Sequence, residues 1–220
     1  MRCGLIALCM VGVNLGSVCS SSMGARIYWV DQLADKIQRS RLDGSEVEDI
    51  ITEGLGLPFA VAVDGKARSL FWSDLLWGTV QTSRLDGSEV KELVSGSGSP
   101  QDIFVDGLND TLYWTDVTDR IMRSNLEGSD IQEIVATGRY PWGIALDLDG
   151  RKMYWANRDD GTIARANLDG TDAEVIVTGL SLPRGIALDL VPEPSTVWLG
   201  GIGVLLLLLK AHLASPPKTD

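Results

Sequence analysis

Cysteine and histidine are almost missing from this 220-residue sequence. The three cysteines, Cys3, Cys9 and Cys19, all lie near the N-terminus, so the chain beyond them has no thiol from which to form a disulfide. The single histidine is His212, close to the C-terminus. A Ser-His-Asp or Cys-His catalytic arrangement is therefore absent, and zinc would lack its usual nitrogen and sulfur ligands.

Positive charge is also scarce. The chain has 19 Lys and Arg against 30 Asp and Glu, and residues 26–190 alone have 16 against 28. Nucleic-acid phosphates would be repelled by such a surface, so we expect no nucleic-acid partner. A solvated acidic surface explains the excess, although a basic partner or divalent cations are also compatible with it.

The first 25 residues have the pattern of a secretory signal peptide. Met1 and Arg2 precede an apolar run from Cys3 to Val18, and a Ser-rich stretch follows. The alternative is a buried first strand or helix. Lipidation at Cys19 is disfavoured, because Gly16-Ser17-Val18 does not have the pattern that precedes an acylated cysteine.

An aromatic pair recurs about every 42 residues, which indicates stacked supersecondary units. The four copies are Ile27-Tyr28-Trp29-Val30-Asp31, Leu70-Phe71-Trp72-Ser73-Asp74, Leu112-Tyr113-Trp114-Thr115-Asp116 and Met153-Tyr154-Trp155-Ala156-Asn157. Their strict period predicts that the aromatic side chains form the core. The acids Asp31, Asp74 and Asp116 are expected to accept hydrogen bonds from the backbone.

Two further signals recur in phase with the aromatic pair. Hairpin turns follow it at Leu42-Asp43-Gly44-Ser45, Leu85-Asp86-Gly87-Ser88, Leu126-Glu127-Gly128-Ser129 and Leu168-Asp169-Gly170-Thr171. Apolar strands led by proline come next, at Pro58 to Asp64, Pro100 to Asp106, Pro141 to Asp147 and Pro183 to Asp189. Each repeat is therefore predicted to have four short strands.

The C-terminus departs from the repeats. A polar linker, Val191-Pro192-Glu193-Pro194-Ser195-Thr196, precedes an apolar run over residues 197–209 that a helix could extend to Leu213 past Lys210. This tail resembles the PEP-CTERM sorting signal of exported bacterial proteins. In that family Pro192, Glu193 and Pro194 would form the motif recognised by an exosortase-type processing enzyme. The Arg-rich cluster usual in the family is missing here, and a plain C-terminal membrane anchor is the alternative.

The three repeated motifs resemble low-density-lipoprotein-receptor class B repeats, the YWTD family of β-propellers. The resemblance implies an all-β fold with four four-stranded blades over residues 26–190. The remaining expected segments are a signal peptide (1–25), the sorting motif and linker (191–196), an apolar membrane or sorting helix (197–213) and a polar tail (214–220).

Closure of the propeller is left open by the repeat order. The first Tyr-Trp strand has no inner strand before it, and the strand from Pro183 to Leu190 has no Tyr-Trp strand after it. Pairing the two would close a four-bladed ring. The family normally has six blades, so an open arc, or a ring completed by a second chain, is also compatible with the sequence.

One propeller face is predicted to bind ligands, because loop aromatics and arginines there are residue types that anchor interfaces. Its residues are Phe59, Trp77, Gln101, Tyr140, Trp142 and Arg184. Leu76 and the pair Asp159-Asp160 lie in the neighbouring loops. Capping of the blade interfaces by these aromatics is the alternative.

We therefore predict an exported, envelope-associated interaction module without enzymatic activity, cofactor or metal. Its partners would be an unknown protein or extracellular polymer, the processing enzyme and, through the C-terminal helix, the membrane. The alternative is a calcium-dependent propeller hydrolase of the lactonase kind. The residue after each Pro-x pair, however, is Ala60, Asp102, Gly143 or Gly185, which supplies one carboxylate where several would be needed. A third possibility is a matrix component with structural duties only.

Overall fold

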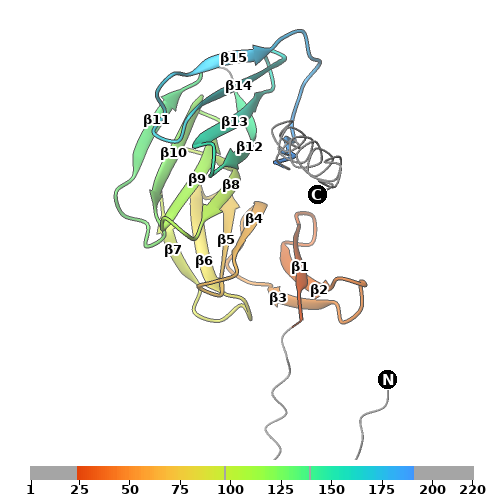
Figure 1. The fold of residues 1–220 in the computed structure, drawn as a ribbon. Helices are drawn as coiled ribbons and strands as arrows, with labels where there is room; N and C mark the ends of the chain where they lie inside the picture. The colour runs from red at the N-terminus through yellow and green to blue at the C-terminus, as the bar shows by residue number, and fades with distance from the viewer. Residues whose placement is uncertain (1–23, 97, 139, 191–220) are drawn as a thin grey trace, which may run out of the picture.

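The computed structural model describes residues 24–96, 98–138 and 140–190, and this part of the chain consists of strands, turns and loops (Figure 1). The first sheet has three strands, β1 (Arg26–Asp31), β2 (Lys36–Arg41) and β3 (Glu48–Ile51). The second has β4 (Pro58–Asp64), β5 (Ser69–Asp74), β6 (Thr79–Arg84) and β7 (Lys91–Val94). The third has β8 (Pro100–Asp106), β9 (Thr111–Asp116), β10 (Arg120–Asn125) and β11 (Gln132–Ala136). The fourth has β12 (Pro141–Asp147), β13 (Lys152–Asn157), β14 (Thr162–Asn167) and β15 (Glu174–Val177).

All pairings are antiparallel between consecutive strands, as the repeats predict. The Asp-Gly turns join the last two strands of each sheet. In one of them, Oδ1 of Asp86 accepts hydrogen bonds from the backbone N–H and the hydroxyl of Ser88, at 3.0 and 2.6 Å. These bonds lower the pKa of Asp86. Where Glu127 replaces the aspartate, the side chain of Asn125 accepts the N–H of Ser129 at 2.8 Å instead.

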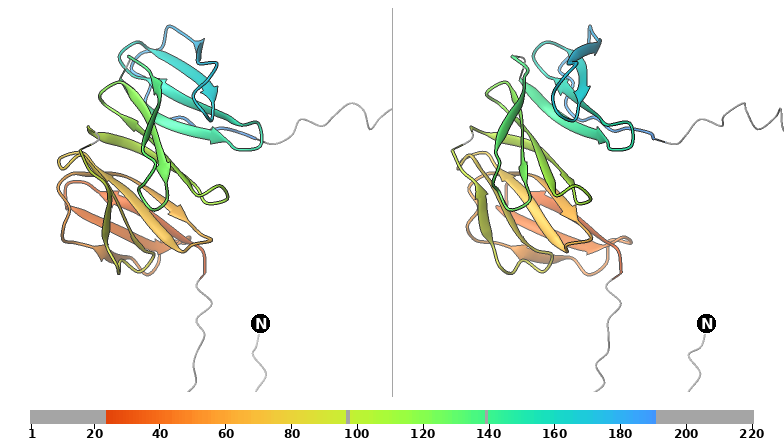
Figure 2. Two further views of the ribbon diagram at one scale, coloured as in Figure 1. Left: turned by 90° about the vertical axis from the view of Figure 1, so that its left-hand side faces the viewer. Right: turned by 60° about the vertical axis from the view of Figure 1, so that its left-hand side comes forward.

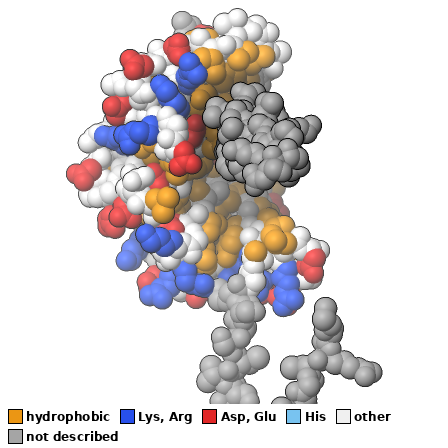
Figure 3. Space-filling view, viewed as in Figure 1, with side chains coloured by type: hydrophobic (Ala, Val, Ile, Leu, Met, Phe, Trp, Pro, Cys, Tyr) orange, Lys and Arg blue, Asp and Glu red, His pale blue; other side chains and the backbone are white. Residues whose placement is uncertain are grey.

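The four sheets stack as consecutive blades around an arc, with the first and fourth sheets at its ends (Figures 1 and 2). The proline-led strands β4, β8 and β12 are the innermost strands of their sheets. Hydrophobic side chains gather toward the concave side of the arc, and charged side chains gather along its convex side (Figure 3). The core thus lies between neighbouring blades rather than within any single sheet.

Each interface between sheets uses the two aromatic positions in opposite ways. Trp72 of the second sheet packs back against Ile37 of the first, whereas Phe71 of the same strand packs forward against the third sheet. Trp114 and Trp155 repeat the backward contact. The prediction that these aromatics form the core is confirmed for the second and third sheets, whose aromatic pairs are buried, while Tyr28 and Trp29 of the first sheet are only half-buried.

The expected strand at residues 183–189 is wrong, because these residues form no strand. The sheet that begins with β1 has three strands where four were expected. Of the alternatives for closure, the described residues form an open arc in which the two ends do not pair. The physical reason is that an inner strand needs a neighbouring strand for its ladder of hydrogen bonds. No Tyr-Trp strand of the described chain is adjacent to residues 183–189.

Several predicted segments lie outside the described residues. They are nearly all of the signal peptide (1–25), the sorting residues Pro192, Glu193 and Pro194, the apolar helix (197–213) and the polar tail. Within residues 24–190, apart from positions 97 and 139, no helix has the length and apolar character needed to cross a bilayer.

Candidate functional site

A hydroxyl in the Tyr-Trp strand connects the inner strands of neighbouring sheets. The hydroxyl of Thr115 accepts the N–H of Asp102 in its own sheet at 3.1 Å and donates to the carbonyl of Trp142 in the next sheet at 2.6 Å. Ser73 makes the same two bonds, to Ala60 N–H at 3.1 Å and to the Gln101 carbonyl at 2.6 Å. These bonds hold the starts of β4, β8 and β12 together at one end of the arc's inner surface.

The acid that follows the hydroxyl orders the loops at the same end. The buried carboxylate of Asp74 accepts N–H bonds from Gly56 and Leu57 before β4, and from Leu76 and Trp77 after β5. The predicted backbone-binding role of the motif acids is thus confirmed. Two loops that are distant in sequence are therefore held next to each other, and both belong to the predicted ligand face.

Three aromatic rings meet over these strand starts. Phe59 of β4 and Trp142 of β12 make an edge-to-face contact with ring centroids 5.6 Å apart, although the third sheet lies between their sheets. Tyr140, in the loop before β12, lies 5.9 Å from Trp142. All three side chains are half-buried, so the group both covers the inner strands and presents surface to solvent.

Two arginines lie on the same rings. The guanidinium of Arg184 is 4.8 Å from the ring centroid of Trp142. That of Arg158, directly after β13, is 5.2 Å from Trp142 and 5.6 Å from Tyr140. We call Phe59, Tyr140, Trp142, Arg158 and Arg184 the aromatic-arginine cluster. Arg158 was not among the predicted site residues. The residue at its position in the other repeats is Gln32, Leu75 or Val117, so an arginine here departs from the repeat, and this departure could have identified it.

Gln101 lies beneath the cluster. Its side chain is only 2% exposed, and its amide Nε2 donates to the hydroxyl of Tyr140 at 3.4 Å. Its Oε1 is buried and has no hydrogen-bond partner within the described residues. Gln101 therefore supports the predicted face from below, and it leaves an acceptor atom there that a donor group could use.

Trp77 is the predicted site residue that lies apart from the cluster. It stands in the turn between β5 and β6 beside Gly56, and its side chain is 49% exposed. Leu76 next to it is also exposed. The structure thus brings five of the six predicted residues together and leaves Trp77 as a separate exposed aromatic.

Asp102, the carboxylate considered for a metal site, has a structural role. Its Oδ2 accepts the N–H of Ile144 in the next sheet at 2.9 Å, and its Oδ1 accepts the N–H of Ile103 at 3.0 Å. Burial raises the pKa of this carboxyl, while the two N–H bonds act in the opposite direction. Within the described residues, no group of three or more His, Cys, Asp or Glu side chains is arranged to hold a metal.

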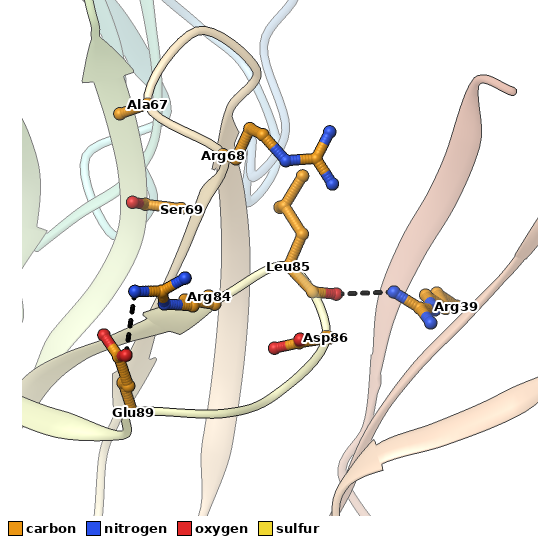
Figure 4. A pocket seen from close by; sticks show the side chains of 8 residues that line it. All are labelled: Arg39, Ala67, Arg68, Ser69, Arg84, Leu85, Asp86 and Glu89. Carbon is orange, nitrogen blue, oxygen red and sulfur yellow. Dashed lines mark hydrogen bonds and ion pairs between the residues drawn. The ribbon is translucent and has the colours of Figure 1, made fainter. Parts of the chain in front are cut away.

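A pocket of about 570 Å³ opens at the opposite ends of the strands, between the first and second sheets (Figure 4). Arg39, Arg68 and Arg84 line it together with Asp86 and Glu89. The guanidinium of Arg39 donates to the carbonyl of Leu85 at 2.7 Å, and Arg84 pairs with Glu89 at 2.8 Å. Two of the arginines thus hold structural contacts, and the pocket contains none of the predicted site residues.

Comparison with known proteins supports the repeat assignment. The model of low-density lipoprotein receptor repeat class B matches residues 25–64 and 151–190. These segments contain the first and last aromatic pairs and the proline-led segments that follow them. No curated protein sequence matches the chain.

Solved structures with the same fold include binding proteins and enzymes. Nidogen, in a complex with laminin, is 25% identical with a TM-score of 0.71, and the match covers 74% of this chain and 64% of nidogen's. An inactive virginiamycin B lyase from Staphylococcus aureus with quinupristin is 19% identical (TM-score 0.61; 74% and 56% covered). A gluconolactonase from Xanthomonas campestris is 20% identical (TM-score 0.61; 74% and 62% covered). The chain therefore spans less than two thirds of each of these structures, and the two enzymes are alike in fold alone.

Proposed function

We propose that this chain is a non-enzymatic interaction module that binds a protein or an extracellular polymer through the aromatic-arginine cluster. The observation that carries the proposal is the position of the Arg158 and Arg184 guanidinium groups on the half-buried ring of Trp142. Rings that are half-buried and flanked by arginine are typical of interface anchors, whereas rings that only cap a core have no need of two cations.

The chemistry of the cluster favours a ligand that carries carboxylates. Arginine presents a planar fork of donors that suits carboxylate geometry, and the rings beside it offer apolar surface to the rest of the ligand. The domain as a whole is acidic, and Arg158 also contacts the carboxylate of Asp159 at 3.2 Å, which a carboxylate of the ligand would join or replace. Nidogen's presence in a complex with laminin supports a role in protein binding by analogy of fold.

The test is a titration of the full chain with two acidic probes, poly-glutamate and a uronic-acid polysaccharide, followed by tryptophan fluorescence. We expect saturable binding that weakens as salt rises, and about tenfold weaker binding for Arg184→Ala, as for a truncated interface anchor. Arg84→Ala, in the pocket at the other end of the strands, is the matched control and should bind as the native chain does. Equal loss in both variants, or no binding of either probe, would contradict the proposal.

We also propose that the chain is exported and then processed or anchored through its C-terminal tail. The support is the sequence: the apolar N-terminal run and the Pro192-Glu193-Pro194 motif. Glu193→Ala should leave export intact and abolish tail processing, which mass spectrometry of the envelope fraction would detect. Tail processing of this variant at the native rate would argue against the sorting role.

The alternative, a calcium-dependent hydrolase, makes a different prediction. Such an enzyme would open a sugar lactone in the presence of Ca²⁺ and lose this activity in chelator. We expect no difference in lactone opening between the two conditions, because Asp102 already accepts two backbone N–H groups.

A further inference from the structure

Within the described residues, each end of the arc has part of an incomplete blade. At the N-terminal end, β1 pairs with β2 along one edge, and the described residues place no strand along its other edge. At the C-terminal end, residues 183–189 have the sequence pattern of an inner strand: Pro183, Ile186-Ala187 and Asp189 match Pro141, Ile144-Ala145 and Asp147 of β12.

Residues 183–189 already lie where the inner strand of a next blade belongs. The carbonyl of Arg184 accepts the N–H of Gly143 in β12 at 2.9 Å. In the two complete interfaces the equivalent carbonyls, of Gln101 and Trp142, are also bound to the preceding sheet. The backbone before Pro183 resembles that before Pro141, since Leu182 and Tyr140 have φ angles of 51° and 52°, whereas Leu57 and Ser99 before the other two prolines have no positive φ.

We propose that β1 of a second copy of this chain pairs antiparallel with residues 183–189, so that two chains together complete one blade. The three complete blades define the register. Proline faces the last residue of the Tyr-Trp strand, in the pairs Pro58 with Asp74, Pro100 with Asp116 and Pro141 with Asn157. The third residue after proline faces tryptophan, in the pairs Val61 with Trp72, Ile103 with Trp114 and Ile144 with Trp155. The same register would place Pro183 opposite Asp31, Ile186 opposite Trp29 and Ala187 opposite Tyr28.

The apolar faces at the two ends fit this pairing. On the side that faces a following blade, the outer-strand residue Val94 is 2% exposed, but its equivalent Val177 in the last sheet is 41% exposed. On the side that faces a preceding blade, Leu112 is fully buried, whereas Ile27 of the first sheet is 43% exposed. In the three interfaces between consecutive sheets, the faces equivalent to these two are covered by the neighbouring sheet. The two open faces are therefore the two halves of one more interface of the same kind.

The Asp-Gly turn of the first sheet has an open space that is filled by a backbone carbonyl in the other three sheets. At Gly87, Gly128 and Gly170, the carbonyl of an outer-strand residue of the preceding sheet lies where a Cβ atom would stand. Gly44, at the same position of the first sheet, faces open space. In the proposed contact the carbonyl of the second copy's Ile176 would fill it.

Charge also agrees with the register. The pairings of Asp64 with Ser69 and of Asp147 with Lys152 predict that Asp189 faces Arg26 of the second copy. The first and last sheets lie at opposite ends of the arc (Figures 1 and 2), so a head-to-tail contact between copies joins surfaces that one chain keeps apart. Such a contact gives a closed ring if the rotation between copies closes and an open chain if it does not.

Cysteine cross-linking of the full chain tests the pairing directly. In a background with Cys3, Cys9 and Cys19 replaced by serine, Tyr28→Cys and Ala187→Cys are introduced into separate chains of different mass. Cross-strand partners are close enough for a disulfide, so mixing and mild oxidation should give a covalent dimer with one chain of each kind. The control replaces Ala187→Cys with Leu188→Cys. Because neighbouring side chains of a strand point to opposite faces, Leu188→Cys should cross-link to Tyr28→Cys far less.

Light scattering provides the second measurement. We expect the native full chain to be a dimer or larger, and Gly44→Asn to associate about tenfold more weakly, since its side chain would occupy the place of the incoming carbonyl. Asparagine tolerates positive φ, and Gly96→Asn, in a loop between the second and third sheets with a similar φ and open space, is the matched control. A monomeric native chain without the mixed disulfide would overturn the proposal. A single chain that carries both Tyr28→Cys and Ala187→Cys is the last check. An internal disulfide in this chain, with no mixed dimer between the single variants, would also overturn the proposal, because the two ends would then meet within one chain.

Discussion

The middle of the arc and its two ends are made from the same repeat, yet they differ in how neighbouring elements are connected. Between complete sheets, the hydroxyls of Ser73 and Thr115 connect one inner strand to the next. At the ends, the same position is Val30 in the first sheet and Ala156 in the last. The hydroxyl is present in the second and third sheets, where one complete blade follows another, and it is absent from the first and last sheets. The sequence itself therefore distinguishes interior interfaces from terminal ones.

The last sheet shows how the contact survives without the hydroxyl. Gly143 has no Cβ, and its N–H reaches the carbonyl of Arg184 directly at 2.9 Å. A side chain at position 143 would collide with that carbonyl. The terminal contact therefore depends on close approach of two backbones, whereas the interior contacts depend on a bridging side chain.

The largest expected effect is on stability, when the same repeat position is truncated in the middle of the arc and at its end. Leu112→Ala should lower the free energy of unfolding by about 2–5 kcal/mol, because it leaves a cavity in a fully buried site. Ile27→Ala, measured by urea unfolding at a concentration low enough for monomers, should cost about 1 kcal/mol or less, since Ile27 is partly exposed. Equal losses would show that the first face is covered within a single chain.

The bridging hydroxyl should matter next. Thr115→Val keeps the shape but leaves Asp102 N–H and the Trp142 carbonyl without their shared partner, which should cost about 1–3 kcal/mol. Ala156→Ser restores a hydroxyl at the end, where Gly143 N–H is already bound, and no gain in stability is expected. Chemical denaturation of both variants checks this. A clear stabilisation by Ala156→Ser would mean that the terminal contact is incomplete.

Close backbone approach gives a more local effect. Gly143→Ala should release residues 183–189 from β12, with faster hydrogen exchange in that segment and a global loss of about 1–3 kcal/mol from overpacking. Gly185→Ala, where a Cβ meets open space, is the control and should leave exchange unchanged. Unchanged exchange in Gly143→Ala would indicate that the segment is held by other contacts.

The smallest effect is on pH dependence. Because burial raises the pKa of Asp102 in the folded chain above its ordinary value of 3.8, the folded state binds more protons than the unfolded state just above that value. The contribution of Asp102 to stability is therefore full at low pH and falls as pH rises through the folded pKa. Asp102→Asn cannot titrate, so its stability relative to the native chain should rise across that window in unfolding experiments at several pH values. A constant difference would contradict the raised pKa.

Several of these features could be predicted from residue patterns and others could not. The strands of the second, third and fourth sheets, the turns and the structural role of Asp74 follow from local spacing, and they are confirmed. The strand predicted at residues 183–189 is wrong.

The contact of Arg158 with Trp142 lies within the fourth sheet, where the N–H of Arg158 donates to the carbonyl of Tyr140 at 3.1 Å. It was missed because arginine at this position departs from the repeat, and spacing alone does not give the direction of its side chain. The separation of Trp77 from the cluster was missed because Trp77 stands in the turn between β5 and β6, and spacing does not record which way a turn side chain points.

The sequence by itself determined the repeat, the four strands of each complete blade and the aromatic core between them, because alternation, turn chemistry and period act over short stretches of chain. Only the tertiary structure decided that Pro183–Asp189 lies against β12 without forming a strand, and that β1 keeps a free edge in the described chain. Those outcomes depend on the sum of small rotations between sheets, which no local pattern records. The same sum brings Phe59 and Trp142 together across an intervening sheet, and it places the two open faces at opposite ends of one arc.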